Sequence, residues 1–395
     1  MISGSDSTVY TCTVLQDRNA SHAVLLRYIK PRSVRPKPSH TAESGERKKW
    51  RIVFFGTDDF ARESLKALHN SMQDGLMVSK LAVVTPKPKP KLCPVAEFAQ
   101  EQRLPLQFWP LTPDYQLESF DFGVVASFGH LIPEKVISAF PLGMLNTHAS
   151  LLPRWRGAAP ITHAVLNGDK VTGITLMRIH PRHFDVGEIV MQKHFAIPPT
   201  ATVPEITGAL ASIGARLLIQ CLHSLDANLA ASIPQPTEGI TYAPKVDPSL
   251  ATIQWSELDA EQVYNRWRAF GHTWKVRTTF HGLPVKLDQA FPPVDTTPPG
   301  SSHYKAIGFP SLLPPPLSSS TSCEISEGGQ KKRAEISYPP GHVILHRKLN
   351  RLFVRCKSGW LPFGQIYVAN KPLMNIAQFA AGYLRPRSPD QHFFS

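Results

Sequence analysis

The 395-residue sequence has few cysteines, no dinucleotide-binding motif and no long apolar run. Its five cysteines are scattered without a Cys-x-x-Cys pair, which argues against a disulfide framework or structural zinc and fits a reducing compartment. The absence of Gly-x-Gly-x-x-Gly argues against a nicotinamide-dependent oxidoreductase. Because we expect no apolar run to be long enough to span a bilayer, and no metal-ligand spacing is present, we expect neither a membrane partner nor a metal.

Acidic residues are scarce relative to basic ones, with 30 Asp and Glu against 43 Lys and Arg and a net charge of +13. The excess is unevenly distributed. Residues 1–49 carry a net charge of +5, residues 50–244 are neutral, and residues 245–395 carry +8. A neutral middle followed by a basic C-terminal part predicts a catalytic domain joined to a nucleic-acid-binding platform. A basic tail that only aids solubility is the alternative.

Residues 1–49 have the composition of a targeting segment. Between Asp17 and Glu43 there is no acidic residue, whereas six Lys and Arg residues occur there. Arg-rich, acid-poor leaders are typical of mitochondrial transit peptides, although Asp6 and Asp17 depart from that pattern. We therefore expect the mitochondrial matrix as the location, with a disordered basic tail as the alternative.

Apolar runs that predict strands alternate with helical stretches from residue 51 onward. We expect strands at 51–56, 80–85, 122–126 and 143–148, with helices at 60–68, 95–102 and 133–140 between them. This alternation predicts an α/β fold with a parallel sheet. Strands at 173–178 and 188–195 follow. A capping-box pattern at Thr202 and Glu205 then opens a helix that runs to about residue 225. The predicted catalytic domain covers residues 50–235.

The rest of the chain predicts a small β-barrel interrupted by an insertion. A helix is expected at 257–270, and a hairpin at 274–287 turns at His281-Gly282. Strand-like runs return at 342–346, 352–356 and 365–368, and a helix is expected at 375–383. Residues 292–340 are rich in Pro and Ser and predict a disordered insertion. The second domain would thus comprise residues 236–291 and 341–385.

Three polar residues form the pattern with the most chemical content. Asn146 and His148 are two apart in a predicted strand, so both side chains point to one face at the strand's carboxyl end. Asp185 follows in a Gly-flanked loop. Asn can donate to an oxyanion, His can donate or move a proton, and Asp can hold the imidazole and favour its charged form. From spacing alone, acyl transfer competes with a structural role, since Asn-x-His is common and Asp beside Gly is frequent in turns.

Residues 146–161 (NTHASLLPRWRGAAPI) resemble the signature of the methionyl-tRNA formyltransferases. Four other segments are similar to the same family: 51–61 (RIVFFGTDDFA), 124–133 (VVASFGHLIP), 173–190 and 240–245 (ITYAPK). The likeness covers about 50–290 and returns more weakly at 341–385. It implies a Rossmann-like formyltransferase domain followed by an OB-like barrel that binds tRNA.

The resemblance also implies an activity and a set of site residues. The formyl donor would be 10-formyltetrahydrofolate, and the acceptor would be the methionyl amine of initiator tRNA, bound by a monomeric enzyme. Catalytic roles fall on Asn146, His148 and Asp185. The residues implied for folate binding are Ser150, Leu151, Leu152 and Pro153, with His130, Leu131 and Ile132 against the pteridine.

Several basic residues are candidates for contact with tRNA phosphates. They are Lys87, Lys89 and Lys91 after the second strand, Arg154 and Arg156 in the signature, and Arg266, Arg268, Lys275 and Arg277 in the second domain. The lysine loop is short and Pro-rich, whereas family members often hold a longer, Gly-containing basic loop there. For each group the alternative is an ordinary solvated surface.

Two other functions remain open at this point. One is a related folate enzyme, such as a formyltetrahydrofolate hydrolase or an amino-sugar formyltransferase, because these share the Asn/His/Asp core. The other is a non-catalytic RNA-binding relative. Trp155 in the signature and the basic C-terminal half favour a tRNA substrate.

Overall fold

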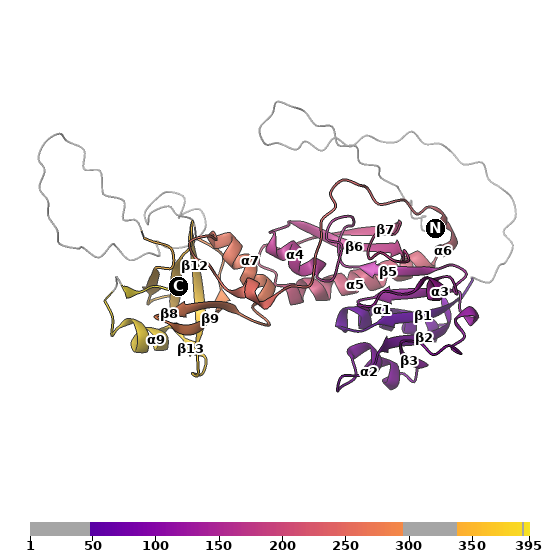
Figure 1. Cartoon of the computed structure of the whole chain (residues 1–395), viewed down its shortest axis with the longest axis horizontal. Coiled ribbons are helices and arrows are strands. Elements are labelled where there is room, and N and C mark those ends of the chain that lie inside the picture. Colours follow the sequence, from indigo (N-terminus) through magenta and orange to yellow (C-terminus); the bar gives the residue numbers. More distant parts are fainter. Residues whose placement is uncertain (1–47, 295–337, 389–390) are drawn as a thin grey trace, which may run out of the picture. The chain divides into compact units, whose positions relative to one another are not determined.

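The computed structural model describes residues 48–294, 338–388 and 391–395 (Figure 1). Nearly all of the predicted leader, and most of the predicted Pro- and Ser-rich insertion, lie outside these ranges. The fold is therefore described from Lys48 onward.

The N-terminal part is built on a seven-stranded sheet with the order β3-β2-β1-β4-β5-β6-β7 (Figure 1). Its strands are β1 (Trp50–Gly56), β2 (Val78–Pro86), β3 (Leu106–Trp109), β4 (Phe122–Ala126), β5 (Met144–His148), β6 (Val171–Arg178) and β7 (Ile189–Ala196). The first five strands in the chain pair in parallel, as predicted. Strands β6 and β7 add antiparallel, and β3 was not predicted because it is short and only partly buried.

Helices cover the sheet because alternate strand residues are apolar on both faces. They are α1 (Asp59–Gln73), α2 (Pro94–Glu101), α3 (Glu134–Ile137), α4 (Pro160–Leu166), α5 (Val203–Leu222) and α6 (Leu225–Ala230), with a 3-10 turn η1 (Leu117–Ser119). In β1, Ile52 and Phe54 pack into one core with residues of α1 and α5, while Val53 and Phe55 pack into a second core with residues from η1 to α3. This three-layer packing is the expected consequence of a parallel sheet buried on both sides.

The helix boundaries follow from local capping. Asp58 Oδ1 accepts from the Ala61 amide at 3.0 Å, which opens α1. The predicted capping box at the start of α5 is confirmed, since the Thr202 amide donates to the Glu205 carboxylate at 2.7 Å. The helix predicted at 133–140 is shorter than expected and spans only Glu134–Ile137.

Helix α5 is long and apolar enough to cross a membrane, judged by length and composition alone. The expectation that no run would reach that length was therefore wrong. However, half of its most apolar window is buried in the fold, and its buried residues belong to the core under β6. It has the burial of a core helix.

The C-terminal part contains a second, six-stranded antiparallel sheet with the order β10-β11-β12-β9-β8, and β13 pairs with β12. Its elements are η2 (Pro248–Ala251), α7 (Ala260–Phe270), β8 (Val276–Phe280), β9 (Leu283–Ala290), β10 (Val343–His346), β11 (Arg351–Arg355), β12 (Trp360–Val368), β13 (Met374–Asn375), α9 (Ile376–Phe379) and the π-helical turn η3 (Ala380–Leu384). The hairpin β8–β9 is confirmed, and its turn residues His281 and Gly282 both have positive φ, as a two-residue type I′ turn requires.

The last residues of the chain join the two edges of this sheet. The Val343 amide donates to the His392 carbonyl at 2.9 Å beside β10, and Ser395 exchanges backbone hydrogen bonds of 2.8 and 2.9 Å with Thr279 of β8. Both edge strands are thereby covered, which gives the sheet its barrel-like character. The predicted barrel is confirmed in this form, whereas the domain boundary near residue 235 stays a prediction.

Gly173 of β6 and Gly208 of α5 provide a matched pair of tests of this packing. A methyl group on Gly173 would overlap the Lys193 carbonyl of β7, while one on Gly208 meets nothing within 4 Å. We expect Gly173→Ala to lower the free energy of unfolding by about 1–3 kcal/mol. We expect Gly208→Ala to raise it by roughly 0.5–1 kcal/mol. Urea unfolding of both variants checks this, and equal effects would contradict the packing described for β6.

Candidate active site

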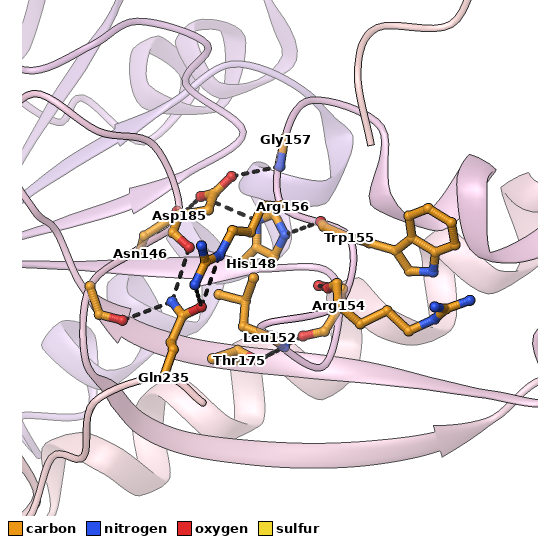
Figure 2. Close-up of polar contacts among 12 residues, drawn as sticks. Asn146, His148, Leu152, Arg154, Trp155, Arg156, Gly157, Thr175, Asp185 and Gln235 are labelled. Atoms are coloured by element: carbon orange, nitrogen blue, oxygen red, sulfur yellow. Dashed lines mark hydrogen bonds and ion pairs between the residues drawn. The ribbon is translucent and has the colours of Figure 1, made fainter. Parts of the chain in front are cut away.

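Strand β5 places Asn146 and His148 on the same side of the sheet, at its carboxyl end. Figure 2 shows both side chains directed at Asp185. Asn146 Nδ2 donates to Asp185 Oδ1 at 3.3 Å, and His148 Nδ1 lies 3.5 Å from the same oxygen. The three predicted residues therefore meet at one carboxylate, although 39 residues separate Asn146 from Asp185 in the chain.

Asp185 lies in the loop between β6 and β7 and is only 8% exposed. Its second carboxylate oxygen, Oδ2, accepts from the Gly157 amide at 2.9 Å. A buried carboxylate requires such partners, because burial without them costs several kcal/mol. The loop after β5 and the loop after β6 are thus joined through this side chain.

His148 is held in a defined orientation by the loop after β5. Its Nε2 lies 2.9 Å from the Trp155 carbonyl, which can only accept, so Nε2 carries a hydrogen. Nδ1 is left facing Asp185. The ring is 6% exposed and can exchange a proton at Nδ1 without giving up its contact with Trp155.

Thr175 of β6 holds the segment predicted to contact folate. Its hydroxyl donates to the Ser150 carbonyl at 2.7 Å. The same hydroxyl accepts from the Leu152 amide at 3.1 Å (Figure 2). Ser150 Oγ donates to the Arg154 carbonyl at 2.6 Å. Ser150 and Leu152 are buried, whereas Leu151 and Pro153 are partly exposed. We call residues 150–153 the border segment of the site. These hydrogen bonds hold the segment in place, and only the side chains of Leu151 and Pro153 are partly accessible.

The second segment predicted for folate follows β4, the parallel neighbour of β5. Ile132 is buried, His130 is exposed, and Leu131 is 47% exposed. Within the described chain, the backbone groups of residues 129–132 form no hydrogen bond with other residues. Since β4 and β5 end at the same edge of the sheet, this segment lies at the edge where Asn146 and His148 are placed.

The predicted tRNA contacts fall into two groups. Lys87, Lys89 and Lys91 are exposed, in the loop after β2, and form no ion pair with any acidic residue in the described ranges. Arg277 lines a cavity on the second sheet, and the remaining candidates are engaged by the protein. Lys275 pairs with Asp288 at 2.5 Å, and the guanidinium of Arg266 donates to the Leu250 carbonyl.

Arg268 is 4% exposed and is not available to a phosphate. Its guanidinium donates to the Ala201 carbonyl at 2.8 Å and to Asn265 at 2.9 Å, and burial lowers its pKa. The expectation that it contacts tRNA is therefore corrected. The sequence alone did not show whether the Arg268 side chain faces solvent or packs against the rest of the protein.

Arg154 and Arg156 are also committed within the protein. Arg154 forms a bidentate pair with Asp169 at 2.6 and 2.8 Å, which raises its pKa, and it lies over the Trp155 ring. Arg156 donates two hydrogen bonds to Gln235 (Figure 2). Asp169 and Gln235 were not identified from the sequence, because neither belongs to a motif and both lie in irregular segments.

A cavity of about 400 Å³ lies on the outer face of the second sheet. Strand register places Arg277 of β8 opposite Lys286 of β9, and Lys286 opposite Tyr367 of β12. Lys371 also lines this cavity. The side chains of Val276, Val285 and Ile366 point to the core, so alternation directs the cationic row outward.

Comparison with known proteins places the chain among formyl transferases. The family model described as formyl transferase matches residues 50–222. The mitochondrial methionyl-tRNA formyltransferase of Homo sapiens is 39% identical over 344 residues, covering 86% of this chain and 79% of that protein. The corresponding protein of Mus musculus is 40% identical over 343 residues, covering 86% and 80%.

A solved structure supports the fold. The N-formyltransferase from Helicobacter canadensis, in complex with folinic acid and dTDP-3-aminofucose, matches with a TM-score of 0.53 and 14% identity. The match covers 80% of this chain and 100% of that one. At this identity the likeness concerns the fold alone.

Thr175 and Thr172, both buried in β6, allow a matched test of the border segment. Replacing Thr175 by Val leaves the Ser150 carbonyl and the Leu152 amide without their partner, and each unpaired buried group costs roughly 1–3 kcal/mol. Thr172 Oγ1 has no hydrogen-bond partner in the described chain, so Thr172→Val is expected to be neutral or stabilising. Urea unfolding measures both, and a Thr175→Val variant as stable as wild type would contradict this account.

Proposed function

Because the chain belongs to the methionyl-tRNA formyltransferase family, we propose that it transfers the formyl group of 10-formyltetrahydrofolate to the methionyl α-amine of initiator tRNA. The observation that carries the proposal is the meeting of Asn146 and His148 at the buried carboxylate of Asp185. A protein that only binds RNA has no use for a desolvated carboxylate facing an amide and an imidazole, because burying that charge opposes folding.

One assay separates this function from its alternatives. Purified protein is incubated with 10-formyltetrahydrofolate and Met-tRNA, and both formylmethionyl-tRNA and free formate are measured. Formylated Met-tRNA supports the proposal. Formate release without tRNA formylation indicates a hydrolase, and tRNA binding without turnover indicates an RNA-binding relative.

The proposed mechanism uses the donors that surround Asp185. Attack of the neutral amine on the formyl carbon moves negative charge to the formyl oxygen. Asn146 gives one Nδ2 hydrogen to Asp185 and has a second hydrogen to donate to that oxygen. His148 can exchange a proton at Nδ1 while Nε2 stays on the Trp155 carbonyl. The Asp185 carboxylate would stabilise the imidazolium formed when His148 takes the amine proton, and that proton would pass to the folate nitrogen as its bond to the formyl carbon breaks.

The residues at this edge fit a folate. The pteridine ring of a folate has apolar faces and a polar edge, and the bound 10-formyltetrahydrofolate would supply the activated formyl group. Ile132 and Leu131 offer apolar contacts, and the backbone of residues 129–132 has unpaired donors and acceptors for a polar edge. Ser150, Leu151, Leu152, Pro153 and His130 would form the remaining wall.

The proposed location is the mitochondrial matrix, with the enzyme acting as a monomer. The relatives from Homo sapiens and Mus musculus are named mitochondrial. The Arg-rich, acid-poor composition of residues 1–49 supports the same compartment. Fractionation of cells that express the full chain, followed by sedimentation of the purified protein, would check both statements.

We further propose that tRNA contacts the outer face of β8, β9 and β12. Arg277, Lys286 and Lys371 surround Tyr367 at the cavity there and form no ion pair with an acidic residue in the described chain. Phosphates would pair with the cations, and the Tyr367 ring offers a surface for stacking a base. The exposed lysines 87, 89 and 91 are proposed as a second contact, at the carboxyl edge of the first sheet.

Asn146→Ala tests the catalytic proposal. Loss of one oxyanion donor is expected to lower turnover roughly 100- to 1000-fold. Steady-state formylation of Met-tRNA measures the effect, with Asn70→Ala on the exposed surface of α1 as the control. Turnover near that of wild type would remove Asn146 from the mechanism.

Lys286→Glu tests the proposed tRNA surface. Reversing one phosphate-contacting charge is expected to raise KM for Met-tRNA about tenfold and to reduce the salt dependence of binding. The KM for the formyl donor should stay unchanged. Lys193→Glu, at an exposed position outside the cavity, serves as the control. Equal effects of the two variants would indicate a diffuse electrostatic contribution and contradict this surface.

A further inference from the structure

The side chain of Gln235 holds the backbone of the loop that contains Asp185. Its Nε2 donates to the backbone carbonyls of Asp185 at 2.9 Å and of Gly187 at 2.8 Å. Its Oε1 accepts from Arg156 Nε at 3.1 Å and from Nη2 at 2.7 Å (Figure 2). Both amide hydrogens and the amide oxygen are therefore used within the protein.

The loop has a conformation that needs such support. Asp185 has a φ of +56°, in the left-handed region that non-glycine residues adopt only at some energetic disadvantage. Gly187 approaches β6 so closely that a methyl group there would overlap the Arg178 carbonyl. The two carbonyls bound by Gln235 flank Val186, so the amide fixes the backbone on both sides of the turn.

The contacts close into a ring. Arg156 is bonded to Gln235, and its neighbour Gly157 donates to Asp185 Oδ2 at 2.9 Å. The Asp185 backbone is held by Gln235, and its Oδ1 faces Asn146 and His148. Movement of Gln235 would therefore change the position of the carboxylate to which both proposed catalytic side chains are bonded.

We propose that Gln235 is a positioning residue for Asp185, acting through the backbone of the loop. The proposal rests on the proposed function, because its effect appears in the formylation rate. The chemistry requires an amide, since the side chain must accept from a guanidinium and also donate two hydrogens to carbonyls. A carboxylate of the same shape can accept but not donate.

Gln235→Glu is the test, with Gln100→Glu on the exposed surface of α2 as the matched control. We expect kcat for Met-tRNA formylation to fall roughly 10- to 100-fold, the loss that a displacement of about 1 Å produces. The KM for the formyl donor is expected to stay within about twofold, because the border segment at Thr175 is not bonded to Gln235. An unchanged kcat, or a change only in KM, would overturn the proposal.

A double-mutant cycle with Asp185→Asn separates positioning from general destabilisation. If Gln235 acts through Asp185, Gln235→Glu should lower kcat little further in the Asp185→Asn background. Multiplicative effects on kcat would overturn the proposal. Gln235→Met, which has a similar length and no amide, gives the same cycle if the Glu variant does not fold. A wild-type protein that forms no formylmethionyl-tRNA would instead refute the proposed function itself.

Discussion

The buried carboxylate of Asp185 joins segments that are far apart in the sequence. Oδ1 receives Asn146 and faces His148 on β5, while Oδ2 receives the Gly157 amide from the next loop. At 8% exposure this charge has little water to solvate it, so these donors set its position. The loops after β5 and β6 are thereby joined, and the geometry proposed for acyl transfer is built from contacts within the protein.

The parts predicted from the sequence are those with a strong local signal. The apolar runs of β1, β2 and β4 and the capping box of α5 have periodicity or a fixed spacing, and each formed where it was expected. The positions of Asn146 and His148 followed from the two-residue repeat of a strand. The antiparallel direction of β6 and β7 depends on pairing between strands, which a local pattern does not encode.

Side-chain partners were predicted less well than elements. Gln235 lies in an irregular segment, and its spacing from Asp185 carries no periodic signal. Arginines counted toward a nucleic-acid surface proved to be donors within the protein, as Arg154 on Asp169 and Arg268 on carbonyls. The planar guanidinium suits such fixed, multiply bonded sites, whereas lysine is strongly hydrated and stays at the surface. In agreement with this difference, the exposed cations include Lys87, Lys89, Lys91 and Lys286. The net charge of the chain therefore overstates the number of cationic side chains that are available to bind RNA.

The location of Gln235 also indicates how much of the chain the proposed active site requires. The part of the chain that matches the formyl transferase model stops at residue 222, and the tether of the Asp185 loop lies 13 residues beyond it. An excised fragment bounded by that match would retain every strand of the first sheet and all three proposed catalytic side chains. It would nevertheless lack the amide that spans Asp185 and Gly187. The proposed positioning contact of the Asp185 loop therefore lies outside the region that the family model matches.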